Sequence, residues 1–291
     1  MKQNVTAIIL LCTSGFLSGC IVNRQAIYVS PFNGNSNIYH TIPLESDSLK
    51  SAFFANAAFA TGKVNFTNPS RNDTTVPGDD NISSFSFNIY RTHNLGIFEF
   101  YYGANFSIGN YSVNKFDSLY NDPTVNPQVI NKYAGKKLFG GYGINGGMNA
   151  VIPFADGGEF RVIGFELTLE HEYGNYLQFR KQIPYSQVTY VAPDNFYGTY
   201  GFFTEILFPK GHLGLKLEKG WIMGSQYNNL MVIDNSSQEN LKYHYFNLTL
   251  SGFINKWTIY MQLNSATKAT TFQFGTNYRL AKKKNSPRTN L

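Results

Sequence analysis

Cysteine, charge and long apolar runs are all scarce in this chain. Only two of its 291 residues are cysteine, both within the first 20, so the remainder can form no disulfide framework, cysteine-based zinc site or cysteine nucleophile. Charged residues make up 14 % of the chain, and no segment beyond the N-terminal one approaches the length of about 18 apolar residues that a membrane helix needs. Burial and backbone hydrogen bonds must therefore stabilise the fold.

The body of the chain also lacks an excess of positive charge. The formal net charge of +6 falls to +5 without Lys2, and then to +1 without Lys282, Lys283, Lys284 and Arg288. A nucleic-acid-binding domain needs a basic face on its folded part, so no nucleic acid is expected as a partner. A basic tail close to anionic lipid headgroups is the simpler interpretation.

The apolar stretch at the N-terminus ends in Leu17-Ser18-Gly19-Cys20, after a positive start at Lys2. Its apolar core is too short to span a bilayer as a stable helix, as in a secretory signal. The four residues resemble the lipobox of bacterial lipoproteins, where the signal peptide is cut before a cysteine that then carries lipid. The resemblance implies loss of residues 1–19, a covalent lipid such as palmitate on Cys20, and work in the cell envelope. The alternative is an ordinary secretory signal that ends near a cysteine.

Phe and Tyr are abundant, at 25 and 20 residues, beside 26 Gly, which is typical of an all-β protein. Apolar and polar residues alternate with period two in many segments, as in strands with one apolar face. One such face carries Phe98, Phe100, Tyr102, Ala104, Phe106 and Ile108. The same alternation recurs in 84–91, 163–172, 213–221, 246–251, 257–264 and 271–280. A soluble sandwich would also alternate, with its apolar face inward.

The links between these strands distinguish a soluble sandwich from a membrane barrel. About ten strands can be drawn, and long links (63–81, 110–136, 174–195, 224–241) alternate with short ones (93–94, 155–158, 209–211, 255–256). This pattern resembles outer-membrane β-barrel proteins, with long outer loops and short periplasmic turns. It predicts an antiparallel up-and-down transmembrane β-barrel.

The expected organisation has four parts. Residues 1–19 are the signal peptide, 20–50 a lipid-anchored lead, 51–281 the barrel and 282–291 a basic tail. The lead does not alternate, so it is expected to be a partly extended periplasmic segment, or one that folds under or into the barrel mouth. An even strand count places both termini in the periplasm. A lipid on Cys20 in the inner leaflet would fit this placement, but the sequence leaves the leaflet open. Asp47-Ser48-Leu49, Asp73-Thr74-Thr75 and Asp117-Ser118-Leu119 resemble the short O-glycosylation signal of Bacteroidetes.

Strand parity predicts a set of charged residues that face the lumen. The set is Glu99, Glu166, Glu170, Glu172, Glu205, Lys216, Glu218 and Arg279. In a barrel of about eight to ten strands, side chains leave little free interior, so these groups should be paired with one another. A polar packing network is therefore expected rather than a transport path or a catalytic acid–base set, and no wide pore.

Two further groups of residues bear on function. Glu170-His171-Glu172 is the best local acid–base cluster, but strand parity turns His171 toward lipid and both glutamates inward. No nucleophile, metal site or cofactor is expected beyond the lipid on Cys20. Aromatic side chains in the outer loops could bind a protein or glycan, or could equally pack the loops together: Tyr111, Phe116, Tyr120, Tyr133, Tyr176, Tyr185, Tyr190 and Tyr227.

The sequence thus favours a non-enzymatic outer-membrane lipoprotein barrel. It would act as an accessory, scaffold or binding component of an envelope complex for secretion, assembly or uptake, with membrane lipid and an envelope protein as partners. Three alternatives remain: a narrow small-solute channel, an outer-membrane lipid-modifying enzyme built around His171 or His244, and a soluble periplasmic β-barrel tethered only by its lipid.

Overall fold

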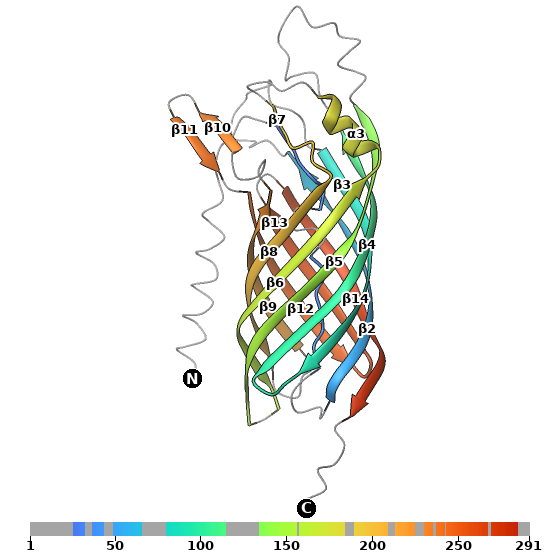
Figure 1. Cartoon of the computed structure of the whole chain (residues 1–291), viewed down its shortest axis with the longest axis vertical. Helices are drawn as coiled ribbons and strands as arrows, with labels where there is room; N and C mark the ends of the chain where they lie inside the picture. Colours follow the sequence, from blue (N-terminus) through green and yellow to red (C-terminus); the bar gives the residue numbers. More distant parts are fainter. Residues whose placement is uncertain are drawn as a thin grey trace, which may run out of the picture.

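The chain folds into a closed barrel of ten antiparallel strands, as the sequence predicts. The computed structural model describes residues 26–32, 37–43, 49–65, 80–114, 134–155, 157–183, 189–208, 213–224, 230–234, 237–241, 243–266 and 269–284. Figure 1 shows an upright barrel of tilted strands, with the remaining elements gathered at its upper end.

The barrel strands follow one another round the wall in chain order. They are β2 (Leu49–Val64), β3 (Asp80–Asn94), β4 (Phe98–Val113), β5 (Gly135–Pro153), β6 (Glu159–Tyr173), β8 (Phe196–Leu207), β9 (Leu213–Met223), β12 (His244–Ile254), β13 (Trp257–Ala266) and β14 (Ala269–Lys284). Pairing of β14 with β2 closes the barrel. The barrel therefore extends slightly beyond the expected range of 51–281. Lys282, Lys283 and Lys284 pair with β2 instead of starting a tail.

Short turns join the strands at one end of the barrel, here called the turn end. Residues 95–97 connect β3 to β4, and Gly96 takes a positive φ of 87° there. Asn255 does the same between β12 and β13, with φ 56°. The first turn was expected at His93 and Asn94, but both residues still belong to β3 and pair with β4. The reason is that the turn itself needs the left-handed backbone that Gly96 supplies.

The opposite end, here called the loop end, carries the smaller elements. A parallel pair joins β1 (Ala26–Tyr28) to β7 (Thr189–Val191), and β10 (Leu230–Asp234) pairs with β11 (Ser237–Leu241). The helix α3 (Asn175–Gln182) follows β6 (Figure 1). No helix among the described residues is long and apolar enough to cross a bilayer.

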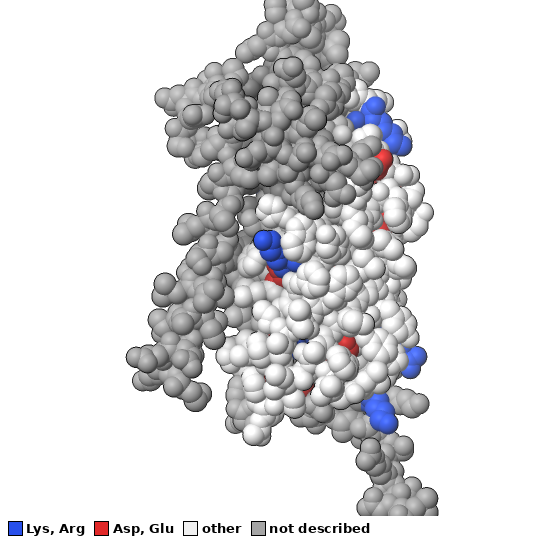
Figure 2. Space-filling model, turned by 60° about the vertical axis from the view of Figure 1, so that its left-hand side comes forward, with Lys and Arg blue, Asp and Glu red and all other residues white. Residues whose placement is uncertain are grey.

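The apolar side chains of alternate positions lie on the outside of the barrel. Phe59 and Ile144 expose 51 % and 60 % of their surface, whereas Glu166 and Glu218 are buried in the lumen. Figure 2 shows one face of this wall, on which few charged side chains reach the surface. A protein with its core inside would show the reverse arrangement. The apolar face is therefore directed away from the barrel interior.

The lead segment threads the lumen instead of lying below the barrel. Its first described residues pair with β7 at the loop end, and the Ile27 amide donates to Asn65 just beyond β2. Asn37 to Pro43 are buried inside the barrel, and β2 then begins at the turn end. We call Ala26–Phe32 and Asn37–Pro43 the strap. The strap enters the barrel mouth, as one of the two expectations allowed.

The strap bears on the expectation that both termini are periplasmic, although the termini themselves lie outside the described residues. Its first residue, Ala26, is at the loop end, while Lys284 ends β14 at the turn end. The even strand count governs only the ten wall strands, and the strap adds one further crossing through the lumen. The even number of wall strands therefore does not place the N-terminal end of the chain in the periplasm.

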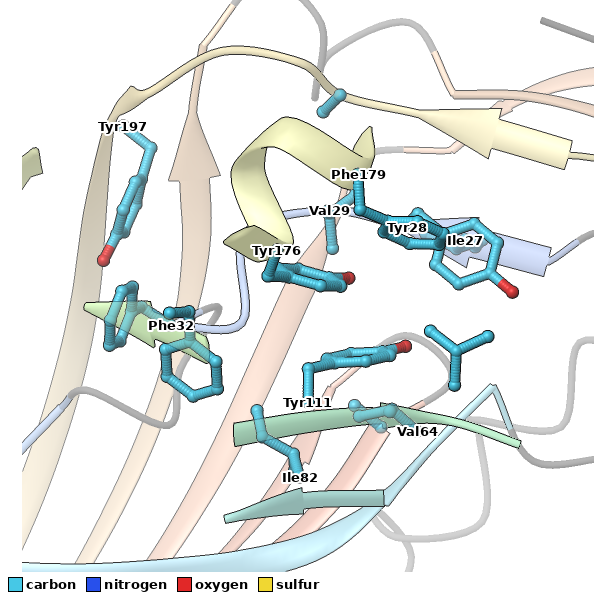
Figure 3. Packing of buried hydrophobic residues seen from close by; sticks show 14 of the residues in the cluster. Ile27, Tyr28, Val29, Phe32, Val64, Ile82, Tyr111, Tyr176, Phe179 and Tyr197 are labelled. Carbon is cyan, nitrogen blue, oxygen red and sulfur yellow. The ribbon is translucent and has the colours of Figure 1, made fainter. Parts of the chain in front are cut away.

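An apolar cluster closes the loop end of the lumen (Figure 3). Strap residues Ile27, Tyr28 and Phe32 pack there against Tyr176 and Phe179 of α3. The wall contributes the inward side chains nearest the mouth: Val64, Ile82, Tyr111, Val113, Phe139, Tyr197 and Ile222. Tyr111 stacks on Tyr176 with ring centroids 4.1 Å apart. This apolar cap separates the polar lumen from the loop end.

Glycines in β5 make room for aromatic rings. A Cβ at Gly140 would lie 2.4 Å from the Tyr173 ring, and one at Gly141 would lie 2.8 Å from the ring of Phe32 in the strap. The bare backbone of this strand is thus covered by neighbouring rings on both of its faces. The run of glycines that interrupts the alternation of β5 has this packing as its cause.

We expect Gly147→Ala to lower the free energy of unfolding by roughly 1–3 kcal/mol, as overpacking usually does. The new Cβ would lie 2.6 Å from the Tyr101 ring and 2.8 Å from the Phe165 carbonyl oxygen. Gly146→Ala is the control, because its nearest atom, the Tyr101 carbonyl oxygen, is 3.2 Å away. Urea unfolding in detergent micelles, followed by tryptophan fluorescence, measures both. Equal losses in the two variants would contradict this account.

Candidate functional site

The lumen contains a charge cluster centred on Arg161, whose side chain is only 1 % exposed. Its guanidinium donates to Glu99 at 3.0 Å and to Glu205 at 2.5 Å. A third donor reaches the carbonyl oxygen of Ile42 in the strap, also at 3.0 Å. Glu159 lies 3.8 Å from the same guanidinium. One arginine thus joins three strands of the wall to the strap.

A second cluster surrounds Lys216 of β9. Its ammonium lies 2.7 Å from Glu166 and 3.4 Å from Glu218, and 4.2 Å from the centroid of the Phe203 ring. All three charged side chains are buried. A buried ion pair that is also hydrogen-bonded avoids the large cost of an isolated charge. This cluster accounts for three charges of the predicted set, and the Arg161 cluster accounts for two more, Glu99 and Glu205.

Two other glutamates have partners higher in the lumen. Glu172 is paired with Arg180 of α3, which also donates to the Ala192 carbonyl oxygen at 2.7 Å. Glu170 accepts a hydrogen bond from Asn105. Burial disfavours the phenolate of Tyr176 beside this site and raises its pKa well above the ordinary value. The Glu172–Arg180 pair fixes α3 over the barrel mouth.

The strap is bonded to the wall along its length. Asn37 donates to Glu218 at 3.0 Å and to the Tyr245 hydroxyl at 2.6 Å. The phenol of Tyr39 donates to Glu205 at 2.6 Å, and the Thr41 amide donates to the Tyr90 hydroxyl at 2.9 Å. Because these partners come from β3, β8, β9 and β12, the strap is held from several sides of the barrel.

Strand parity located seven of the eight predicted lumen residues, namely the six glutamates and Lys216. Arg279 is different: it is only half-buried, next to an irregularity in the pairing of β14, and no ion pair of this residue occurs in the described structure. Its inclusion in the paired network is wrong. The alternation of facing is lost at 279–281, where the pairing of β14 with β2 shifts, so strict parity does not hold at this position.

Arg161, Glu159 and Arg180 were missed. A register shift in β6 between Arg161 and Gly164 leaves Val162 and Ile163 both exposed on the outer face. Strict alternation from Ile163 would place Arg161 outside, but the β-bulge restores it to the lumen. The signal was present in the sequence, because two adjacent apolar residues beside an isolated arginine indicate such a shift.

The predicted loop aromatics fall into three groups. Tyr111 and Tyr176 are buried in the apolar cap, so they pack the loop end together and do not present rings to a partner. Tyr190 lies in β7. The others lie outside the described residues: Phe116, Tyr120, Tyr133, Tyr185 and Tyr227. The three glycosylation-like motifs also lie outside them, except Leu49, which begins β2.

His171 and His40 contact amide side chains and aromatic rings of neighbouring residues. His171 is half-buried, 2.9 Å from the Asn195 side chain, and its ring meets that of Tyr142. His40 of the strap stacks on Tyr101 with centroids 4.2 Å apart. Ser251 donates to the Tyr39 hydroxyl at 3.3 Å. In the part of the chain that the structure describes, no group of three or more acidic, His or Cys side chains is placed to hold a metal.

These features define a closed ten-stranded barrel with an apolar exterior and a lumen occupied by its own strap. Solved structures that it resembles are outer-membrane barrel proteins. An outer membrane channel from Pseudomonas putida F1 is 10 % identical over 84 % of this chain and 98 % of that one, with a TM-score of 0.36. The beta domain of the Bordetella autotransporter BrkA is 9 % identical over 79 % and 98 %, with a TM-score of 0.37.

A KdgM porin is 10 % identical over 78 % of this chain and 99 % of its own length, with a TM-score of 0.28. No protein family and no curated protein matches the chain by sequence. Matches at this level of identity and structural agreement do not assign the chain to a family.

Proposed function

We propose that this protein is an outer-membrane lipoprotein whose barrel crosses the membrane and serves as a non-enzymatic binding component of an envelope complex. The observation that carries the proposal is an apolar exterior around a lumen that is already full. Wall strands of 10 to 19 residues suit a tilted crossing of the hydrocarbon core. A closed barrel satisfies every backbone group in the wall, as a lipid environment requires.

The outer face argues against a soluble periplasmic barrel tethered only by lipid. Exposed apolar patches larger than a few hundred Å² are rare on soluble monomers. Here large side chains are exposed on strand after strand, including Phe59, Phe85, Tyr102, Ile144, Phe202 and Phe274. Among the described residues of the wall strands, the buried glutamates all point inward. A lipid environment is the surrounding that suits such a face.

The filled lumen supports a binding role rather than conduction or catalysis. The strap and the apolar cap occupy the interior, and the charged side chains there are engaged with each other and with the strap. The surfaces left for recognition are the loop end and the outside of the wall. At the loop end α3 exposes Asn175, Gln178 and Lys181, which are polar side chains suited to a protein partner.

Photo-crosslinking tests this role. A photoreactive phenylalanine analogue at Gln178, on the exposed side of α3, is expected to give one discrete adduct in native envelopes, because the partner docks at the loop end. The same analogue at Ile163 is the control, since that side chain is 58 % exposed on the wall and would contact lipid. Electrophoresis and mass spectrometry identify the adduct. Equal, diffuse crosslinking from both positions would reject the loop end as a binding surface.

A further inference from the structure

The path of the strap fixes the side of the barrel on which the chain begins. Ala26, Ile27 and Tyr28 pair with β7 at the loop end, in register with Thr189, Tyr190 and Val191. Further along, the Ile42 carbonyl oxygen accepts from Arg161, the third residue of β6, near the turn end. The chain therefore runs from the loop end to the turn end before β2 begins (Figure 1).

The apolar cap holds the start of the strap in place. Tyr28 is fully buried and its ring meets that of Phe179 edge-on, with centroids 5.2 Å apart. Phe32 stacks on Tyr197 at 6.0 Å and meets Phe139 at 5.1 Å (Figure 3). The Ala192 amide also donates to the Tyr28 carbonyl oxygen at 3.0 Å. The described chain therefore begins at the loop end, and Ala26 is held there.

Chain length then limits where Cys20 can be. It precedes Ala26 by six residues, which span at most about 20 Å when fully extended. The 15 residues of β3, tilted by about 40°, give the wall a height of roughly 38 Å. Cys20 therefore cannot reach the membrane leaflet at the turn end from a chain that leaves at the loop end.

We propose that Cys20 lies on the loop side of the membrane, so that its acyl chains insert in the outer leaflet beside the barrel while the C-terminus lies in the periplasm. This inference rests on the proposed lipid anchor and on outward-facing loops. The protein would thus carry a surface-facing lipid whose connection to the periplasmic side runs through its own lumen. The lipid and the strap together would tether the loop end to the outer leaflet.

Epitope tagging tests this path in the full-length protein. The same short epitope is placed in three separate variants: between Val22 and Asn23, between Asn121 and Asp122 in the link after β4, and after Leu291. Antibody binding is compared on intact and permeabilised cells. We expect the first two tags to be labelled on intact cells to a similar extent, and the C-terminal tag only after permeabilisation.

The three tags separate failure of this inference from failure of the proposed function. An N-terminal tag that behaves like the C-terminal one, while the loop tag is labelled on intact cells, overturns the inference. If instead the loop tag is labelled only after permeabilisation, the proposed orientation of the barrel is wrong. In that case, an N-terminal tag that is labelled under the same conditions as the loop tag still supports the proposed path of the strap. Radiolabelled palmitate should mark the wild type and not Cys20→Ser. Absence of label from both would remove the lipid anchor and leave the tag comparison valid.

Discussion

Arg161→Met is expected to lower the free energy of unfolding by about 3–5 kcal/mol, the range for removing one partner of a buried ion pair. The change leaves Glu99 and Glu205 without the donors that now lie 3.0 and 2.5 Å away. It also removes the donor to the Ile42 carbonyl oxygen. Methionine fills a similar volume, so the loss reports on the charges rather than on a cavity. Urea titration in detergent micelles, read from the heat-modifiable band on gels, measures it.

Two further variants make this expectation specific. Arg161→Lys should recover only part of the loss, because an ammonium donates from one nitrogen, whereas the three partners of Arg161 are reached from Nε, Nη1 and Nη2 of the planar guanidinium. Arg279→Met is the matched control, since this arginine is half-buried and no ion pair of it occurs in the described structure. We expect its effect to stay within about 0.5 kcal/mol, as for an ordinary surface change. Equal losses at Arg161 and Arg279 would refute the central role of the cluster.

Much of the wall could be predicted from the sequence because its rules are local. Period-two alternation specifies which side chains face lipid, and it placed Glu99, Glu166 and Lys216 correctly in the lumen. The alternation of long and short links gave the strand direction and count. Parity failed where the register shifts, at Arg161 in β6 and at Arg279 in β14. A β-bulge changes the facing of every residue beyond it, so strict alternation gives the wrong side there unless the bulge is recognised from adjacent apolar residues such as Val162 and Ile163.

The strap could not be predicted in the same way, because many of its contacts are distant in sequence. The side chains of Asn37 and Tyr39 donate to residues 166 to 208 positions away, and no periodicity marks an extended segment without a partner strand in the wall. One indirect signal was available. Many inward positions carry small side chains, such as Ser84, Ser86 and Ser107. About eight strands already suffice for side chains to fill a barrel, so ten strands lined by serine leave room for another element.

Removing the strap should convert the closed barrel into a channel. A variant in which residues 26–43 are deleted, with Gln25 joined to Leu44, loses both the strap and its part of the apolar cap. In planar bilayers we expect discrete openings from this variant and no steady current from the wild type. The current should favour cations. Among the described residues, the lumen carries seven carboxylates against three cations, namely Arg161, Lys216 and Arg180 at the mouth. The carboxylates are those of Glu99, Glu159, Glu166, Glu170, Glu172, Glu205 and Glu218. The reversal potential in a salt gradient gives the sign, and steady wild-type currents would instead favour the small-solute channel.

The deletion tests assembly as well as conduction, since the strap bridges the seam where the barrel closes. The Tyr39 carbonyl oxygen accepts from Asn56 of β2 at 3.3 Å and from Asn277 of β14 at 3.1 Å, and these strands are the first and last of the wall. A strap in place before closure would therefore align the two edges. If the deletion does not fold, Asn37→Ala combined with Tyr39→Ala keeps the cap and weakens the strap within the lumen. This variant should give brief openings, and a silent bilayer would show that these side chains do not seal the lumen. It keeps the Tyr39 carbonyl oxygen, so closure is tested by Asn56→Ala combined with Asn277→Ala, which removes both donors at the seam. We expect that variant to refold more slowly into detergent, and a wild-type refolding rate would show that the strap does not guide closure.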